Sequence, residues 1–388
     1  MRRHLHRHPE LSGQEYHTTR YLSGFVERLG LRPHLSGDQR GLIADFDTYT
    51  GVSSRDRVPG KRLALRGDID ALPIHDAKQV DYRSLNEGVM HACGHDVHPT
   101  VVCGALQLLM AMHESNDLPW PVSVRGILQP AEEIAIGARH MIDHDAIEGV
   151  HAIIALHVDP SRPVGRIGLR AGLLTAACDM IHVDFQGRGG HGARPHLCDD
   201  PIDACTLWVQ SAFRTISRVV SAAETVVLSI GQLTAGHSAN VIPDHASLSG
   251  SLRSLDAQSR QIALDALRSV GNSVREQTGC QVEMRLGVSA PAVINDGRMI
   301  RVLSDSAVEV ISSTAPDPIA EPSMGSEDFS YYLQQVPGAM VRLGVAGPTV
   351  GTEPLHTTCF DVDEGCLAVG VKLFAAAVIN EFDPESDL

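Results

Sequence analysis

The sequence lacks the paired cysteines of a structural zinc site, a long apolar run and an excess of positive charge. None of the eight cysteines stands in a Cys-x-x-Cys pair, which excludes the ligand spacing of zinc fingers and zinc ribbons. No uninterrupted apolar stretch approaches the roughly 20 residues that a helix needs to span a bilayer. We therefore expect neither a zinc-finger module nor a membrane segment.

The net charge, the N-terminal segment and the cysteines indicate which partners and which location to expect. The chain has 32 Lys and Arg against 47 Asp and Glu, a formal net charge of -15, which repels phosphate backbones and anionic membranes. The basic segment Met1 to His8 is followed by Pro9 and Glu10, so we expect no signal peptide. The scattered cysteines suit reduced thiols. We expect a cytoplasmic protein that binds neither nucleic acid nor membrane.

The length of 388 residues and the 43% of hydrophobic residues predict two domains, each with its own core. In the N-terminal part, predicted strands alternate with predicted helices. The strands are expected at 61–66, 122–129 and 150–158, and the helices at 14–30, 99–113 and 133–142. This alternation predicts an α/β fold around a largely buried sheet.

A different pattern follows a glycine-rich turn that ends at Gly172. The segments 179–186, 200–220, 224–233, 246–253, 256–277 and 280–287 are predicted as strand, helix, strand, strand, helix and strand. That order is typical of a ferredoxin-like sandwich. Predicted helices at 299–313 and 361–380 and a strand at 339–344 then resume the first pattern. We predict a small α+β domain, 173–288, inserted into a larger domain made of 1–172 and 289–388.

Residues Met90 to His98 contain one thiol and three imidazoles. Cys93 and His95 can converge on one cation if the chain bends between them, and Gly94 permits such a bend. The cluster therefore indicates half of a catalytic metal site. His91 and His98 fit supporting roles, the first beside the ligands and the second as a helix cap.

Two adjacent acids, Glu132 and Glu133, directly follow a predicted strand, where α/β proteins build their sites. Because adjacent side chains diverge, one glutamate can bind metal while the other accepts a proton from a water molecule. The alternative is that both acids complement the dipole of a helix N-terminus. His157 at a strand end and His356 before the last predicted helix are further candidate ligands, or else hydrogen-bonded structural groups.

Asp68 and Asp70 lie two residues apart at the end of a predicted strand, so both can face the same side. One such acid typically orients a ligating imidazole. In the small domain, His191 lies in a glycine-rich turn, and Asn240 and Arg253 suit a ligand carboxylate or carbonyl. The alternatives are a flexible turn with incidental histidines and a surface salt bridge for Arg253.

Together, eight segments in order resemble the peptidase M20 family of two-metal peptidases. The resemblance is strongest to its amidohydrolase subfamily, which includes hippurate hydrolases, auxin (IAA)-amino acid hydrolases and N-acyl-amino acid amidohydrolases. The segments are Leu5-His6 with Pro9–Ser12, Arg66–Pro73, His91–His98, Gln129–Glu133, Gly189–His196, Asn240–Asp244, Met324–Phe329 and Leu355–Thr357. The resemblance implies a phosphorylase/hydrolase-like α/β catalytic domain with the mixed sheet of zinc peptidases, and an inserted ferredoxin-like dimerisation, or lid, domain.

The resemblance also implies roles for individual residues. It implies a two-metal site of Cys93, His95, Glu133, His157 and His356, bridged by Cys93. Glu132 becomes the general base and Asp68 a catalytic support, although Asp70 stays open as the acid that orients a ligand. His191 would reach the active site of a neighbouring subunit and stabilise the oxyanion. Asn240 and Arg253 would bind the carboxylate side of the substrate.

The resulting hypothesis is a cytoplasmic, homodimeric amidohydrolase that cleaves N-acyl amino acids with two divalent metal ions per subunit. Zinc or manganese is expected, and cobalt or nickel are alternatives. A dipeptidase or small-amide hydrolase would use the same groups. From a different class, a catalytically silent dimeric binding protein could keep the fold, but it would have little reason to keep Glu132 and all five ligands.

Overall fold

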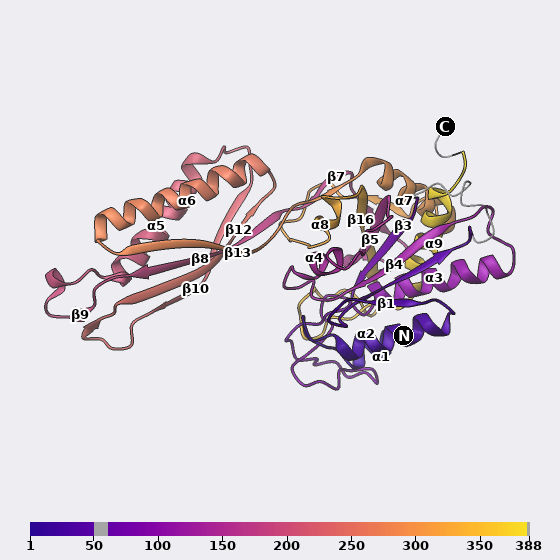
Figure 1. Ribbon diagram of the computed structural model, residues 1–388, viewed down its shortest axis with the longest axis horizontal. Helices are drawn as coiled ribbons and strands as arrows, with labels where there is room; N and C mark the ends of the chain where they lie inside the picture. Colours follow the sequence, from indigo (N-terminus) through magenta and orange to yellow (C-terminus); the bar gives the residue numbers. More distant parts are fainter. Residues whose placement is uncertain (50–60, 386–388) are drawn as a thin grey trace. The chain divides into compact units, whose positions relative to one another are not determined.

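The computed structural model describes residues 1–49 and 61–385, and the chain divides into two compact units (Figure 1). The large unit comprises Met1–Leu174, Val293–Glu321 and the chain from Glu327 onward, and the small unit comprises Thr175–Ala292 and Pro322–Ser326. The predicted small domain was 173–288. The structure adds Pro322–Ser326 to it, a segment far along the chain whose place the sequence did not indicate.

The large unit contains an eight-stranded mixed sheet in the order β1-β2-β4-β3-β5-β16-β6-β15. Its central strands β4, β3, β5 and β16 are parallel, whereas β2 and β6 run antiparallel to their neighbours β4 and β16. The strands are β1 (Pro33–Leu35), β2 (Leu42–Asp47), β3 (Leu63–Asp68), β4 (Ser123–Gln129), β5 (Ala152–Pro163), β6 (Ile167–Leu169), β15 (Pro316–Pro318) and β16 (Gly338–Ala346). A separate pair joins β7 (Gly172–Thr175) to β14 (Val293–Asn295).

Burial explains why the central strands are apolar runs. Every residue of β3 and β4 is buried, as expected for strands covered on both faces. The helices of this unit are α1 (Arg2–Arg7), α2 (Tyr16–Arg28), α3 (His98–Glu114), α4 (Gly137–Ile142), α7 (Gly297–Val310), α8 (Ser330–Leu333) and α9 (Gly365–Glu381). Helix α3 packs against β3 and α9, and α7 also contacts α9.

The parallel strands bring polar residues to one edge of the sheet. Asp68, the last residue of β3, pairs with Gln129, the last residue of β4. Helix α3 starts close to β3 because Gly67 has no side chain. A Cβ at Gly67 would lie 2.8 Å from the carbonyl carbon of His98, a distance that real Cβ contacts do not reach. The start of α3 therefore lies directly against the end of β3.

The small unit is a ferredoxin-like sandwich. Its sheet has the order β10-β12-β8-β13, and all neighbouring strands are antiparallel. Helices α5 and α6 lie side by side on one face of this sheet (Figure 1). The elements are β8 (Ala177–Gln186), β9 (Gly190–His191), η1 (Pro195–Leu197), α5 (Pro201–Val219), β10 (Val226–Ala235), β11 (Val241–Ile242), β12 (His245–Ser254), α6 (Ala257–Thr278) and β13 (Gln281–Ala290). The predicted fold class is confirmed.

One predicted helix is wrong over its first turn. We expected a helix at 133–142, but α4 begins only at Gly137. Ala131 and Ala135 have φ angles of 53° and 54°, in the left-handed region that interrupts a right-handed helix. The segment that carries Glu132 and Glu133 is therefore a tight turn.

Within the described residues, no helix is long and apolar enough to cross a bilayer.

Candidate metal and catalytic centre

Cys93 lies between two histidines from distant parts of the large unit. Its Sγ is 3.4 Å from Nε2 of His157 in β5 and 3.3 Å from Nε2 of His356, in the loop before α9. The predicted bend occurs at Gly94, whose φ is +84°. A Cβ at Gly94 would lie 2.3 Å from Cγ2 of Val158. The chain can therefore present Cys93 and His95 together only with glycine between them.

His95 extends the cluster towards Glu133. Its Nδ1 is 3.0 Å from Oδ1 of Asp70, and its Nε2 is 3.8 Å from Oε1 of Glu133. Both of these last two atoms are buried and lack a hydrogen-bond partner within the described residues. Oε1 of Glu133 also lies 3.7 Å from Nε2 of His356. The five predicted ligands thus converge, in one group of Cys93, His95 and His157 and another of Cys93, Glu133 and His356.

The tautomer of His157 leaves its Nε2 atom available as a metal ligand. Its Nδ1 donates to the carbonyl oxygen of Val158 at 2.8 Å, so the unprotonated Nε2 faces Cys93. Burial lowers the pKa of His157, and the charge of Arg342 lowers it further.

His356 has a φ of +62°, a conformation that costs a non-glycine residue about 1–3 kcal/mol and is often found at functional sites.

His98 holds the centre together through both ring nitrogens. Its Nδ1 donates to Oδ1 of Asp68 at 2.5 Å, and its Nε2 accepts from the backbone N–H of Val158 at 3.1 Å. His98 therefore supports the site, because neither nitrogen remains for a metal. The supporting role expected for His91 is not seen: within the described residues neither of its ring nitrogens makes a hydrogen bond.

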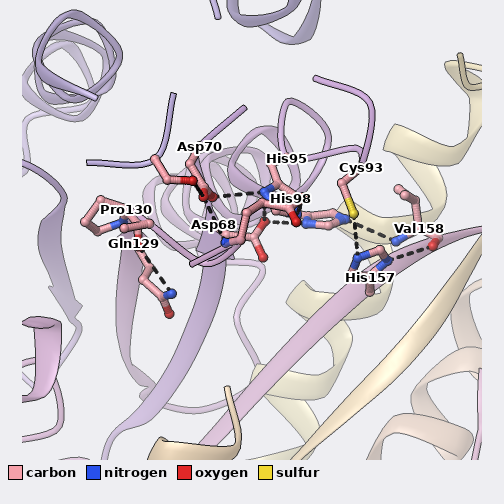
Figure 2. A network of polar contacts seen from close by, with 12 residues as sticks. Asp68, Asp70, Cys93, His95, His98, Gln129, Pro130, His157 and Val158 are labelled. Atoms are coloured by element: carbon pink, nitrogen blue, oxygen red, sulfur yellow. Dashed lines mark hydrogen bonds and ion pairs between the residues drawn. The ribbon is translucent and has the colours of Figure 1, made fainter. Parts of the chain in front are cut away.

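Asp68 and Asp70 contact different histidines. Asp70 orients His95 directly, whereas Asp68 lies 3.8 Å from the same nitrogen and bonds to His98. Figure 2 shows the two aspartates facing His95 and His98, and Cys93 facing His157. We expected one of the two acids to orient a candidate ligand imidazole, and Asp70 holds that of His95.

Arg66 carries a buried network that sequence reasoning did not assign. Its guanidinium bonds to Asp68 at 2.5 Å, to Glu327 at 2.9 Å and to Asp328 at 2.8 Å. The signal was present in the sequence, since Glu327 and Asp328 are adjacent acids in the Met324–Phe329 segment. These two carboxylates lie close to Glu132.

Glu132 is the carboxylate in the centre that has no partner. Within the described residues it makes no hydrogen bond and no ion pair, and it is 8% exposed. Burial raises the pKa of Glu132 well above its usual range, and the charges of Glu327, Asp328 and Glu133 raise it further. Burial also raises the pKa of Glu133 to about 7, although His95 opposes this. An unpartnered carboxylate of raised pKa suits a proton acceptor.

Three carboxylates fix the turn that carries Glu132. Asp70 Oδ2 accepts from the backbone N–H of Glu133 at 3.0 Å, and Asp328 Oδ2 accepts from that of Ala138 at 2.9 Å. Glu15 Oε1 accepts from the backbone N–H of Ala131 at 2.8 Å. Each of these acids is buried. The turn is therefore held in its left-handed conformation from several sides.

The three remaining predicted residues belong to the small unit. Within this unit, β9 pairs with β11, which sets His191 opposite Val241 and beside Asn240. Arg253 pairs with Cys178 at the start of β8, and its Nη1 donates to the carbonyl oxygen of Met324 at 2.7 Å. Because β8 spans about 30 Å between its ends, one chain does not bring Asn240 and Arg253 to a single small ligand.

Comparisons with known proteins show the family of this chain. Residues 64–380 match the model of peptidase family M20/M25/M40. An N-acetylcysteine deacetylase of Bacillus subtilis is 36% identical over 98% of this chain and 95% of its own. Thermostable carboxypeptidase 2 of Saccharolobus solfataricus is 33% identical over 98% of this chain and 94% of its own.

A solved structure extends the likeness to three dimensions. It is the crystal structure of a Bacillus subtilis protein described as a dinuclear metal-binding peptidase of the M20 family. The two are 33% identical, with a TM-score of 0.79 over 98% of this chain and 96% of that one. The present chain therefore belongs to peptidase family M20/M25/M40 and is a hydrolase that acts on amide bonds.

Proposed function

We propose that this protein is a metal-dependent amidohydrolase that cleaves the amide bond of N-acyl amino acids. The observation that carries the proposal is the convergence of two groups of metal-ligating side chains on Cys93, with the unpartnered Glu132 beside them. The relative that acts on N-acetylcysteine supports an N-acyl amino acid as the substrate class.

The donor set fits two divalent cations. Ligands about 2.0–2.3 Å from a tetrahedral zinc ion lie about 3.3–3.8 Å from one another, and the contacts of Cys93 and His95 fall in this range. A buried imidazole nitrogen and a buried carboxylate oxygen without partners are what a cation would satisfy. We propose Cys93 as the shared ligand, and zinc or manganese ahead of cobalt or nickel.

When bound, the cations would polarise the amide carbonyl and acidify a water molecule. Glu132 would take the proton from that water and pass it to the leaving amine, as its raised pKa favours. Asp70 would hold His95 in the ligating tautomer, and Asp68 would hold His98 beneath the centre. The Arg66 network would keep Glu327 and Asp328 from accepting the proton in place of Glu132.

The small unit would complete the site in a homodimer. We propose that His191 and Asn240, which lie side by side, reach the site of the neighbouring subunit, where His191 stabilises the oxyanion. Arg253 remains a candidate for the carboxylate side of the substrate. All eight cysteines are free thiols, which supports a cytoplasmic location.

A dipeptidase or small-amide hydrolase is the second candidate. The thermostable carboxypeptidase among the relatives favours it, because the same residues would hydrolyse a peptide bond. A silent binding protein is disfavoured, since it has no use for a free carboxylate at Glu132.

A hydrolysis screen tests the proposal. Acetyl, benzoyl and indole-acetyl amino acids and a set of dipeptides are incubated with chelator-treated protein, to which each metal is added back in turn. The proposal expects turnover of N-acyl amino acids that depends on added metal. Turnover of dipeptides alone would favour the second candidate, and metal-independent turnover would contradict the metal site.

A further inference from the structure

Arg342 stands next to the metal-ligand cluster although the local sequence gives no hint of a function. It lies in β16, opposite His157 of the parallel neighbour β5 and opposite Gly168 of the antiparallel neighbour β6. Residues that pair directly across neighbouring strands place their side chains on the same face of the sheet. Arg342 therefore projects from the face on which His157 contacts Cys93.

The guanidinium of Arg342 has no partner. Within residues 1–49 and 61–385 it makes no hydrogen bond and no ion pair. Two of the acids near it are bound to other arginines: Glu327 is 2.9 Å from Arg66, and Asp159 is 3.1 Å from Arg162. Arg342 as a residue is partly exposed.

Several nearby charges act on the guanidinium of Arg342. Burial lowers the pKa of Arg342, while Glu327, Asp159, the Cys93 sulfur and Glu132 raise it. These influences agree with the place of Arg342 opposite His157 in the sheet. A partly desolvated cation costs free energy unless an anion accompanies it, and bound divalent cations would add to that cost.

We propose that Arg342 binds the carboxylate of the substrate, so that the enzyme selects N-acyl amino acids with a free carboxylate beside the scissile amide. This inference rests on the proposed amidohydrolase function and names the group that fixes its substrate. A planar guanidinium with free N–H groups matches a carboxylate with two parallel hydrogen bonds. The substrate carboxylate would supply an anion to pair with this guanidinium.

Arg253 is the competing residue for this role. Its Nη1 already donates to the carbonyl oxygen of Met324, whereas the guanidinium of Arg342 has no hydrogen-bond partner among the described residues. A second competing role for Arg342 is contact with the oxyanion that develops during amide hydrolysis. The two roles differ in their dependence on the substrate carboxylate, and that difference decides the experiment.

The test compares an N-acetyl amino acid with its carboxamide and methyl ester. Metal-loaded wild-type protein is assayed beside Arg342→Met, Arg342→Lys, Arg253→Met and the control Arg166→Met. Arg166 is a partly exposed arginine of the same region that pairs with Asp317 at 3.1 Å. Circular dichroism and metal analysis verify that each variant is folded and loaded.

We expect Arg342→Met to lower kcat/KM for the carboxylate substrate about 10- to 100-fold, mainly through KM. The values for the carboxamide and ester should change little. Arg342→Lys keeps the charge but loses the planar fork, so it should lose several-fold. Arg166→Met should behave as wild type. Equal losses on all three substrates, or loss of carboxylate preference in Arg253→Met alone, would overturn the proposal.

A binding measurement separates this inference from the proposed function. In a Glu132→Gln background, calorimetry measures the Kd of the N-acetyl amino acid and of its carboxamide, with and without Arg342→Met. Weaker binding of the carboxylate alone supports the inference even if turnover is not detected. Unchanged Kd values overturn it even if wild-type protein hydrolyses every substrate. If Arg342→Met does not fold, unchanged carboxylate preference in the folded Arg342→Lys protein overturns it.

Discussion

Asp70 joins His95 to the backbone of Glu133. One carboxylate oxygen lies 3.0 Å from Nδ1 of His95, and the other accepts from the backbone N–H of Glu133 at 3.0 Å. A single buried side chain thus sets the tautomer of one candidate ligand and the position of another. The Ser12 hydroxyl also donates to Asp70 at 2.7 Å, so the carboxylate is itself held in place.

Asp70→Asn should weaken metal binding about 10- to 100-fold, because an amide cannot accept both hydrogen bonds as the carboxylate does. Metal affinity is measured by competition with a chelator of known affinity. The matched control is Asp81→Asn, which changes an exposed aspartate and should leave the affinity unchanged. Equal affinity in both variants would show that Asp70 does not position the ligands.

Gly94→Ala should disrupt the metal site more than Gly88→Ala does. Both Gly94 and Gly88 have positive φ angles, of 84° and 75°, so an alanine at either costs about 1–2 kcal/mol. Only at Gly94 would the new Cβ also collide with Val158, whereas Gly88 has open space around it. Urea unfolding and metal titration of the two variants measure the difference. Similar metal affinity in both would contradict the tight bend.

Glu381 should make stability depend on pH in acid. Although burial raises the pKa of Glu381, hydrogen bonds from His151 and Arg298 lower it below its usual value. Because the folded pKa lies below the unfolded one of about 4.3, the stabilisation is complete above pH of about 4.3 and is lost as pH falls through the folded pKa.

The variant Glu381→Gln tests this directly. It should lower the free energy of unfolding by about 1–3 kcal/mol at pH 7, because His151 and Arg298 lose a charged acceptor. It should also reduce the decline in stability on acidification, as measured by urea unfolding between pH 3 and pH 7. Exposed Glu87, changed to Gln, is the control. An unchanged pH profile in Glu381→Gln would be evidence against the linkage.

Hybrid dimers should test whether His191 serves the neighbouring subunit. Separately, Glu132→Ala and His191→Ala proteins should each be inactive. After subunits exchange, a hybrid dimer has one site with both residues intact, so part of the wild-type activity should return. Absence of recovery, once exchange is verified with tagged subunits, would count against a site shared between chains.

Much of the fold followed from local patterns. Local patterns were enough to predict strands β3, β4 and β5 and the order of strands and helices in the small unit. These elements follow from burial and periodicity, which are visible within a few residues of the sequence. The turn at Glu132 did not follow, since alanine carries no signal for the left-handed φ of Ala131 and Ala135. Strand β2 and the short strands at the edges were also missed.

The candidate site depended on contacts that no local pattern contains. Cys93 lies 64 residues from His157 and 263 residues from His356 in the sequence, so only the resemblance to a family suggested that they meet. Arg342 was missed because a lone arginine in an apolar strand resembles an edge residue. Its importance appears only when its neighbours across β5 and β6 are known.

The most direct test of the account measures metal content and turnover together in Glu132→Ala. Glu132 is proposed as the base and not as a ligand, so this variant should keep the metal content of wild-type protein and lose turnover of an N-acyl amino acid by about 10²- to 10⁴-fold. Cys93→Ala, measured in parallel, should lose metal instead. Full turnover in Glu132→Ala, or full metal content in Cys93→Ala, would contradict the central claim.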